Sequence, residues 1–363
     1  MTQAIPRGAE LARRQPSAAV PVEAAVSDAS SRRPRHAADD GLSVLGPWKI
    51  GGLAAEGALA RVYRAWPHAR GETPAANQSS GHPAGSPIKP DETLKSDVGV
   101  GTQSVPYAIK ILRPEWRDHP EAVRVFAREA LVGRQVAHRN LVPVLASNVG
   151  RPPRYLVMPW LDGRTLGALL RDTASSETAS SETVARSDLP SVLWYARQVA
   201  TALDALHRSG WTHGDVKPSN VMISAGGHVT LLDAGFAQRE GESIAAVDRC
   251  VMGTCAYMAP ELLASRLRAD IRADLYSVGV ILYQALCGRL PYQGSSAAEL
   301  ATRHRTAAAP PPRRLAPHLP REVAELIVQL LAKNPLRRPQ SPAELVERLV
   351  RLEIATLPLT ASA

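Results

Sequence analysis

The sequence has few aromatic residues and few cysteines. Aromatic side chains make up 4% of the 363 residues, although the net charge at pH 7 is +9. Single-stranded nucleic acid is usually bound by basic grooves with interleaved aromatic side chains, and here arginine is scattered through every region, so no nucleic-acid partner is expected. The three cysteines, Cys250, Cys255 and Cys287, match no zinc-binding spacing and suggest no disulfide framework, which favours a reducing compartment.

Long apolar runs are also missing. No stretch reaches the roughly 18 apolar residues of a membrane-spanning helix, so no membrane span is expected. The N-terminus lacks the apolar core of a secretory signal. Together these absences predict a cytoplasmic protein, whereas the oligomeric state cannot be read from the sequence. Hydrophobic residues nevertheless make up 45% of the chain, which is enough for a full core.

Several segments lack hydrophobic periodicity. Residues 1–43 are rich in Ala, Arg, Ser and Pro and are predicted to form a disordered tail. Residues 67–104 are predicted to be a disordered insertion within a domain, which is tolerated because loop-closure entropy rises only logarithmically with length. Residues 172–188 contain a tandem Ala-Ser-Ser-Glu-Thr repeat and are predicted to be a second, low-complexity insertion. Residues 356–363 form a short tail.

The stretch from residue 210 to 237 holds two acids, a lysine and an asparagine at fixed offsets. They are Asp215, Lys217, Asn220 and Asp233, with a short apolar hairpin between the last two. The hairpin would place Asn220 and Asp233 at neighbouring strand ends, where an amide oxygen and a carboxylate can share a hard cation such as Mg2+. Asp215 would be free to take a proton, and Lys217 could reach a phosphate. This combination suits phosphoryl transfer, in which positioning and charge neutralisation provide most of the catalysis.

Two motifs in this stretch resemble those of protein kinases. The run His213–Asn220 resembles the catalytic loop H-R-D-x-K-x-x-N, and Asp233–Gly235 resembles the metal-binding D-F-G motif. Further motifs follow in the family's order over about residues 44–355, and the resemblance is closest to bacterial eukaryotic-like Ser/Thr kinases. It implies that Asp215 accepts the proton of a substrate hydroxyl and that Lys217 neutralises the γ-phosphate of ATP.

The resemblance also implies a fold and two cofactors. It predicts an α+β, two-lobe kinase fold, with a small β-rich N-lobe at residues 44–158, a hinge at 159–163 and a larger, mostly helical C-lobe at 164–355. ATP would bind between the lobes, and Asn220 and Asp233 would hold Mg2+.

A lysine in an apolar strand needs a partner, because an unpaired buried ammonium is costly. The strand Val105–Leu112 resembles the family's V-A-I-K strand, whose lysine, here Lys110, would bind the α- and β-phosphates. A helix is predicted over residues 120–137 from the helical spacing of its apolar residues. Its acids are Glu121 and Glu129. Glu129 lies in the middle of the helix, and the run 138–142 that follows resembles the family's H-P-N-I-V, so the resemblance makes Glu129 the expected partner of Lys110.

The resemblance assigns further residues to the nucleotide site. The glycine-rich loop over the phosphates is eroded, since alanine stands at its two outer glycine positions and only the middle glycine survives. A gatekeeper and two hinge positions follow the last strand of the N-lobe. The additional residues predicted to contact nucleotide are Ala55, Gly57, Val62, Ala108, Met158, Pro159, Leu161 and Met222.

Some positions depart from the family pattern. Gly214 replaces the arginine that would pair with a phosphorylated activation-loop residue, and Ser243 is the only hydroxyl side chain between Phe236 and Gly253. These two departures predict that loop phosphorylation does not switch the enzyme on. Ala234 and Gly133 remove bulk where the family stacks apolar side chains, which would loosen the active state.

The C-terminal motifs concern substrate docking and anchoring. Gly253–Glu261 resembles G-T-x-x-Y-x-A-P-E, and Asp274 matches an aspartate that holds the catalytic-loop backbone in the family. Arg338 is expected to pair with Glu261. The presence of Lys217 favours Ser/Thr hydroxyls of proteins as acceptors, and Thr254, in the docking element, agrees.

Three hypotheses follow. The first is an ATP-dependent protein kinase that phosphorylates serine and threonine. The second is a pseudokinase that acts as a nucleotide-binding or scaffold module, which the eroded glycine-rich loop would favour. The third is a small-molecule kinase of related fold, which the docking element and Lys217 oppose.

Overall fold

The computed structural model describes most of the predicted domain. The residues described are 43–68, 105–175, 188–239, 242, 255–263 and 270–357. All of them belong to one unit, residues 33–363, defined by its internal contacts. The predicted tail up to Leu42 and most of both predicted insertions lie outside the described residues. Pro67 and residues 172–175 were predicted to lie in the insertions, but Pro67 ends a strand and residues 172–175 belong to a helix.

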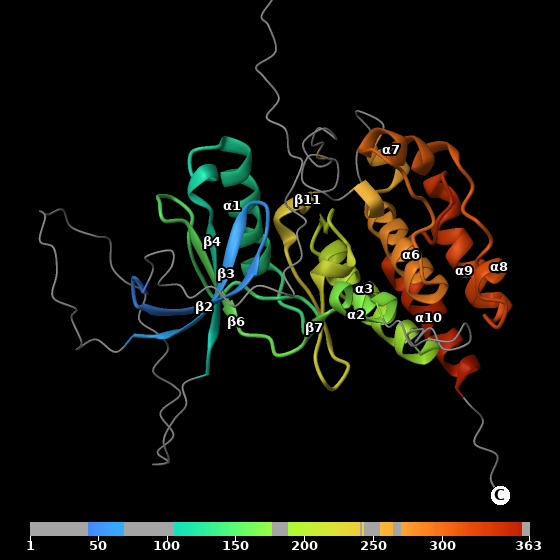
Figure 1. Cartoon of the computed structure of the whole chain (residues 1–363), viewed down its shortest axis with the longest axis horizontal. Helices are drawn as coiled ribbons and strands as arrows, with labels where there is room; N and C mark the ends of the chain where they lie inside the picture. The colour runs from blue at the N-terminus through green and yellow to red at the C-terminus, as the bar shows by residue number, and fades with distance from the viewer. Residues whose placement is uncertain are drawn as a thin grey trace, which may run out of the picture. The chain divides into compact units, whose positions relative to one another are not determined.

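The N-terminal part is an antiparallel sheet with the strand order β1-β2-β3-β4-β6-β5. Figure 1 shows these strands in blue to green, with helix α1 beside them. The sheet forms because apolar residues in its central strands alternate between two covered faces. Its strands are β1 (Val44–Leu45), β2 (Trp48–Glu56), β3 (Ala60–Pro67), β4 (Tyr107–Leu112), β5 (Ala146–Asn148) and β6 (Tyr155–Pro159).

Each face of this sheet has its own apolar cluster. One cluster joins Leu112 and Leu156 to Phe126 of α1 (Pro120–Gln135). The other joins Tyr63 and Ile109 to residues of β1 and β2. The predicted helix over 120–137 is therefore present and ends two residues early, at Gln135. It is held against the sheet by its apolar stripe.

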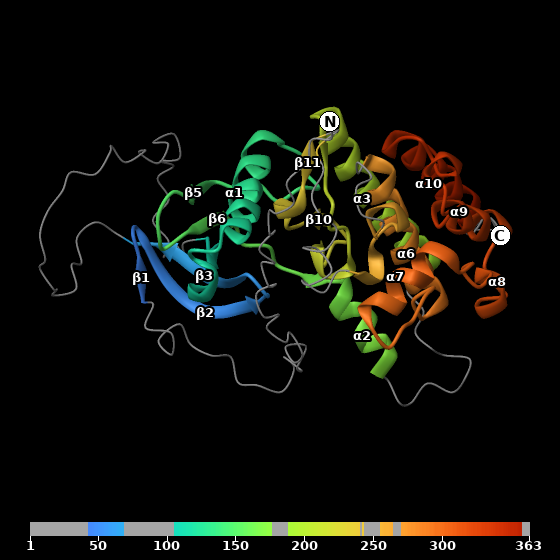
Figure 2. The ribbon, with the colours of Figure 1, turned by 90° about the horizontal axis from the view of Figure 1, so that it is seen from above.

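The C-terminal part is mostly helical, as predicted, so the two-lobe α+β fold class is confirmed. Helix α6 is buried along most of its length, with α3 and α9 packed against it and α10 packed on α3, an arrangement visible in Figure 2. The helices are α2 (Leu166–Ser175), α3 (Leu189–Arg208), α5 (Pro260–Leu263), α6 (Ile271–Cys287), α7 (Ala297–Thr306), α8 (Pro312–Leu315), α9 (Arg321–Leu330) and α10 (Pro342–Thr356). In the part of the chain that the structure describes, no helix has the length and apolar character needed to cross a bilayer.

Short strands carry the polar motifs. The predicted hairpin is present as β9 (Val221–Ile223) and β10 (Val229–Leu231), with β7 (Arg164–Thr165) on its outer edge. A second small sheet pairs β8 (Trp211–Thr212) with β11 (Gln238–Arg239).

Main-chain hydrogen bonds join the segment after α1 to this hairpin. The amide of Val142 donates to the carbonyl of Leu231 at 3.1 Å, and the amide of Leu231 donates to the carbonyl of Asn140 at 2.8 Å. The two lobes are thereby joined beside the polar motifs.

The residues Ser341–Glu344 form half of a capping box at the start of α10. The hydroxyl of Ser341 accepts from the amide of Glu344 at 3.1 Å. The carboxylate of Glu344 accepts from the amide of Gln340 at 2.7 Å rather than from that of Ser341. Two amides at the start of the helix are thus hydrogen-bonded, but Glu344 binds the amide of the residue before the N-cap instead of the amide of the N-cap itself.

Candidate active site

The loop between β8 and β9 is anchored on α6. The carboxylate of Asp274, which is buried in the first turn of that helix, accepts from the amides of His213 at 2.7 Å and Gly214 at 2.8 Å. This bears out the anchoring expected of Asp274. Because α6 is enclosed by other helices, the loop is attached to a rigid element.

His213 locks the same loop from the inside. Its Nδ1 accepts from the amide of Asp215 at 3.2 Å, so its proton lies on Nε2, which donates to the carbonyl of Leu232 at 3.0 Å. Burial lowers the pKa of His213 and keeps the ring neutral in this tautomer. The imidazole therefore links the loop to the end of β10.

Gly214 suits its position for a conformational reason. Its φ is +77°, a left-handed value that strains residues with a side chain. Glycine relieves that strain, and residue 214 contributes no guanidinium that could bind a phosphate.

Asp215 lies at the centre of the loop and is buried. Its Oδ2 accepts from Lys217 Nζ at 2.8 Å and from Asn220 Nδ2 at 2.9 Å. Its Oδ1 is also buried and has no hydrogen-bond partner among the described residues. Burial raises the pKa of Asp215, against the opposing charge of Lys217. An unsatisfied buried carboxylate oxygen is costly unless a ligand meets it.

The ion pair predicted between Lys110 and Glu129 is present. Lys110 Nζ lies 2.7 Å from Glu129 Oε2 and 2.9 Å from Asp233 Oδ1. Burial would lower the pKa of Lys110, but the charges of Asp233 and Glu129 outweigh it and raise the pKa. Strand β4, helix α1 and the residue after β10 thus converge on one ammonium group.

The two acids respond differently to this environment. Burial raises the pKa of Glu129 to about 7, although Lys110 opposes the shift. Burial would also raise the pKa of Asp233, but the charge of Lys110 prevails and lowers it. Asp233 is therefore the firmly ionised acid of the two.

Asn220 and Asp233 fit a magnesium ion. The carbonyl of Asn220 accepts from the amide of Leu232 at 2.8 Å. The backbone at Asn220 therefore lies beside the segment that leads into Asp233. Asn220 donates to Asp215 through its amide nitrogen, so its side-chain oxygen could serve as a ligand together with the carboxylate of Asp233. Among the described residues no cluster of three or more His, Cys, Asp or Glu could hold a metal. Mg2+ suits such a sparse site because it is usually held by one or two carboxylates and keeps its waters or substrate phosphates.

Several predicted nucleotide residues share one face of the sheet. Val62 on β3 lies opposite Lys110 on β4, and Ala108 on β4 lies opposite Met158 on β6. Since residues two apart on a strand point to the same side, these four side chains lie on one face. Their contact with adenine or phosphate remains a prediction.

The other predicted nucleotide residues come from separate elements. Ala55 and Gly57 lie at the exposed end of the β2–β3 hairpin. Pro159 ends β6, and Leu161 follows it, half-buried. Met222 lies on β9, opposite Thr165.

The expected loosening at Gly133 is wrong. A Cβ placed on Gly133 would lie 2.6 Å from Cγ2 of Val144, and the amide of Val144 donates to the carbonyl of Gly133 at 2.9 Å. Val144 thus fills the space that a larger side chain would take, and α1 is closely packed here. Ala234 is half-buried against the apolar cluster of the C-lobe.

Helix α1 has a second attachment that was not predicted from the sequence. Arg128 Nη1 pairs with Glu242 Oε2 at 2.8 Å, and the same carboxylate oxygen accepts from the amide of Arg239 at 3.2 Å. The guanidinium groups of Arg128 and Arg239 both lie over the ring of Trp211, at 5.1 and 4.6 Å. In the sequence, only the position of Arg128 next to Glu129 could have indicated this second attachment. Ser243, Gly253 and Thr254 lie outside the described residues.

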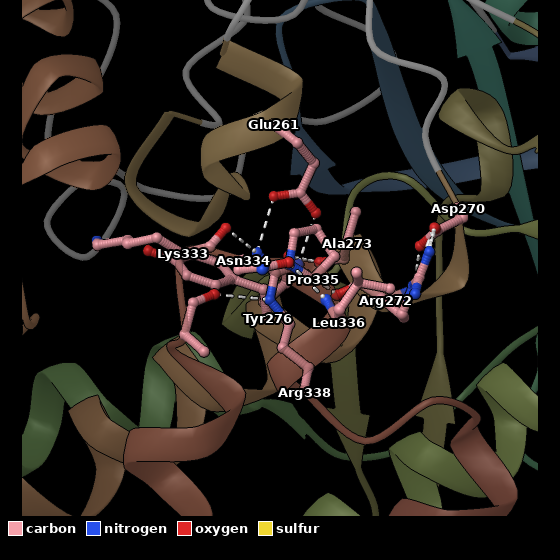
Figure 3. A network of polar contacts seen from close by, with 12 residues as sticks. Glu261, Asp270, Arg272, Ala273, Tyr276, Lys333, Asn334, Pro335, Leu336 and Arg338 are labelled. Carbon is pink, nitrogen blue, oxygen red and sulfur yellow. Dashed lines mark hydrogen bonds and ion pairs between the residues drawn. The ribbon is translucent and has the colours of Figure 1, made fainter.

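The predicted pair between Glu261 and Arg338 is present. Arg338 donates from Nη1 and Nη2 to the two carboxylate oxygens of Glu261, at 2.6 and 2.8 Å (Figure 3). It also donates to the carbonyl of Arg272 at 2.8 Å. Both side chains of the pair are almost fully buried, so they are shielded from solvent.

An open groove of about 690 Å3 lies elsewhere, between α3 and α10. None of the predicted site residues lines it. Its charged residues, Arg197 and Glu353, pair with each other at 2.7 Å, and the other lining residues are mainly apolar. The groove therefore lacks the combination of charged side chains that phosphoryl transfer needs.

Known proteins provide an independent comparison. A probable serine/threonine-protein kinase of Clostridium acetobutylicum is 29% identical over 267 residues, which are 70% of this chain and 39% of that protein. PrkC of Bacillus subtilis is 30% identical over 231 residues, 64% of this chain and 34% of PrkC. PknA of Mycobacterium tuberculosis is 33% identical over 240 residues, 64% of this chain and 52% of PknA. The chain thus spans a third to about half of these relatives' length.

The family comparison covers more than half of the chain. The family described as protein kinase domain matches residues 99–349. The match omits β1 to β3, which the structure nevertheless pairs with β4 in one sheet. The chain belongs to the protein kinase family.

Proposed function

We propose that the protein transfers the γ-phosphate of ATP, with Mg2+, to serine or threonine hydroxyls of protein substrates. The observation that carries the proposal is the carboxylate of Asp215, which has one oxygen held by Lys217 and Asn220 and the other buried without a partner among the described residues. A substrate hydroxyl would donate its proton to that second oxygen. Because burial raises the pKa of Asp215, its carboxylate is a stronger base than aspartate in water.

The neighbouring groups supply positive charge. As the acceptor oxygen bonds to the γ-phosphorus, the bond from phosphorus to the ADP oxygen breaks, and negative charge spreads over the phosphoryl oxygens. Lys217, 2.8 Å from Asp215, would neutralise part of this charge. Lys110, oriented by Glu129, would hold the α- and β-phosphates. Mg2+ on Asn220 and Asp233 would screen the remaining phosphate charge.

The acceptor class is supported by likeness. The relatives compared above are named serine/threonine-protein kinases, and Lys217 agrees with hydroxyl acceptors of that kind. Protein substrates with Ser/Thr acceptors and a cytoplasmic location are proposals drawn from the sequence.

We also propose that phosphorylation of the activation loop is not needed for activity. The carboxylate of Glu242 already pairs with Arg128 of α1, adjacent to Glu129, so a negative charge is present at the helix without modification. Gly214 offers no guanidinium to bind a phosphorylated residue.

A pseudokinase is the alternative. Alanine at positions 55 and 60 of the glycine-rich loop favours it. The assembled contact of Lys110 with both Glu129 and Asp233 opposes it, because an ion pair of this kind is needed to hold nucleotide for transfer.

Phosphate transfer from labelled ATP separates the two. The purified full chain is incubated with Mg2+ and a generic basic protein, and Lys110→Met is compared with Lys49→Met, an exposed lysine on β2. We expect label with the wild type and Lys49→Met and a loss of at least about 100-fold with Lys110→Met. No label with the wild type would favour the pseudokinase, and equal label in all three would contradict the assigned site.

A further inference from the structure

The three-residue turn between β2 and β3 is held from outside through all of its carbonyl groups. The carbonyl of Gly57 accepts from Arg113 Nη1 at 3.2 Å. The carbonyl of Ala58 accepts from Trp116 Nε1 at 2.9 Å. The carbonyl of Leu59 accepts from the amide of Arg113 at 2.9 Å. One segment, residues 113–116, therefore binds every residue of the turn.

These bonds fix the direction of the amide groups. In a planar trans peptide the N–H points opposite to the carbonyl of the preceding residue. With the carbonyls of residues 57–59 directed at residues 113–116, the N–H groups of Ala58, Leu59 and Ala60 point the other way. Successive N–H groups facing one side form a concave site for an anion.

The holding segment is itself well fixed. Arg113 directly follows β4, which carries Lys110, and its Nη2 pairs with Glu115 at 2.5 Å. Trp116 packs against the apolar cluster beneath α1 and lies edge-on to His119, 5.3 Å between ring centroids. His119 precedes the first residue of α1. The turn is thus tied to the two elements that carry Lys110 and Glu129.

The turn does not need glycine for its conformation. A Cβ on Gly57 would lie 3.4 Å from the carbonyl oxygen of Ala60, an ordinary contact. Alanine at positions 55 and 60 narrows the backbone freedom that glycines would give. A turn fixed by outside hydrogen bonds loses little entropy when a ligand binds, which favours affinity.

We propose that Trp116 and Arg113 are positioning residues for the phosphates of ATP, holding the amides of residues 58–60 in a preformed phosphate site. This inference rests on the proposed function. It gives the eroded glycine-rich loop a binding role: fixed hydrogen bonds replace the adaptability of the missing glycines.

The test removes one donor and keeps an aromatic side chain at the position. Trp116→Phe deletes the indole N–H, and Trp194→Phe is the matched control, because Trp194 Nε1 donates to the carbonyl of Gly227 at 3.1 Å in the C-lobe. Arg113→Met is a second variant that keeps the main-chain bond to Leu59. Each full-length protein is titrated with Mg2+-ATP and, separately, with adenosine, which lacks phosphates. Hydrogen exchange is followed at the amide of Gly57, which donates to the carbonyl of Ala60 at 2.8 Å.

For Trp116→Phe we expect the Kd and KM for Mg2+-ATP to rise about fivefold with kcat unchanged, as for loss of one hydrogen bond that serves binding. The Kd for adenosine should stay the same, and the Gly57 amide should exchange about fivefold faster without nucleotide. Arg113→Met should act in the same direction, and Trp194→Phe should change none of these.

The inference and the proposed function fail in different ways. If the variants at positions 113 and 116 both bind Mg2+-ATP as tightly as the wild type does, the inference alone is overturned. Equal losses for adenosine and Mg2+-ATP would also overturn it, since the phosphates would not be involved. A wild type that neither binds Mg2+-ATP nor transfers phosphate would overturn the proposed function.

Discussion

His304 lies outside the active site, and burial changes the pKa of its side chain. Its ring is fully buried, with Nδ1 2.9 Å from the hydroxyl of Tyr276 and the ring of Tyr292 packed against it at 4.7 Å. Burial, with the nearby charge of Lys333, lowers the pKa of His304 to about 4 from 6.5. The folded protein therefore binds this proton less well than the unfolded chain.

His304 should make stability depend on pH between these two values. Above pH 6.5 neither the folded nor the unfolded protein binds this proton, so the neutral ring of His304 contributes its full share of stability. As the pH falls towards 4, the unfolded chain is protonated while the folded protein is not, and the folded state loses stability. The loss is on the order of 3 kcal/mol. Urea unfolding from pH 7 to 4 should show a shallower loss for His304→Phe than for the wild type. Parallel curves would contradict the assignment, and the exposed His318→Leu serves as control.

At the scale of elements, α1 is attached on two sides. Glu129 pairs with Lys110 of β4, while the preceding Arg128 pairs with Glu242 beyond β11. Burial alone would raise the pKa of Glu242, but the hydrogen bonds from Arg128 and from the amide of Arg239, with the charges of both arginines, outweigh it and lower the pKa. Glu242 therefore keeps its charge at neutral pH.

Removing this charge should weaken the hold on α1. Glu242→Ala is expected to lower kcat/KM about fivefold, because the pair is partly exposed and worth about 1 kcal/mol. The double variant Arg128→Glu/Glu242→Arg should recover most of the loss. Glu121→Ala, on the same helix, is the control.

Steady-state kinetics of the wild type before and after phosphatase treatment test whether loop phosphorylation is needed. A loss of activity on dephosphorylation would contradict independence from loop phosphorylation.

Much at this scale could be predicted from sequence, because it depends on local patterns. Apolar periodicity predicted α1 and the β9–β10 hairpin. The buried lysine predicted an acidic partner on α1, and the family resemblance identified it as Glu129. The contacts of Arg113, Trp116 and Glu242 could not be predicted in this way. Trp116 meets a carbonyl 58 positions away and Glu242 a guanidinium 114 positions away, and such pairs leave no local pattern. The error at Gly133 has the same origin, since Val144 fills its space.

For the whole molecule, the pair of Glu261 with Arg338 joins segments 77 positions apart. Arg338→Met would leave the Glu261 carboxylate buried and uncompensated, at a cost of about 3–5 kcal/mol in unfolding free energy. Arg338→Met/Glu261→Leu should regain most of that loss. Denaturant unfolding measures both, with the exposed Arg321→Met as a control expected to change nothing. A single variant as stable as the wild type would show that the pair is not stabilising.

The central claim also belongs to the whole molecule: groups from both lobes converge on Asp215 and the Lys110 site. The most direct test compares Mg2+-ATP binding and phosphate transfer in the wild type and Asp215→Asn. We predict an unchanged Kd with transfer reduced about 10²–10⁴-fold, because only the proton acceptor is lost. Equal transfer rates in the two proteins would contradict the account.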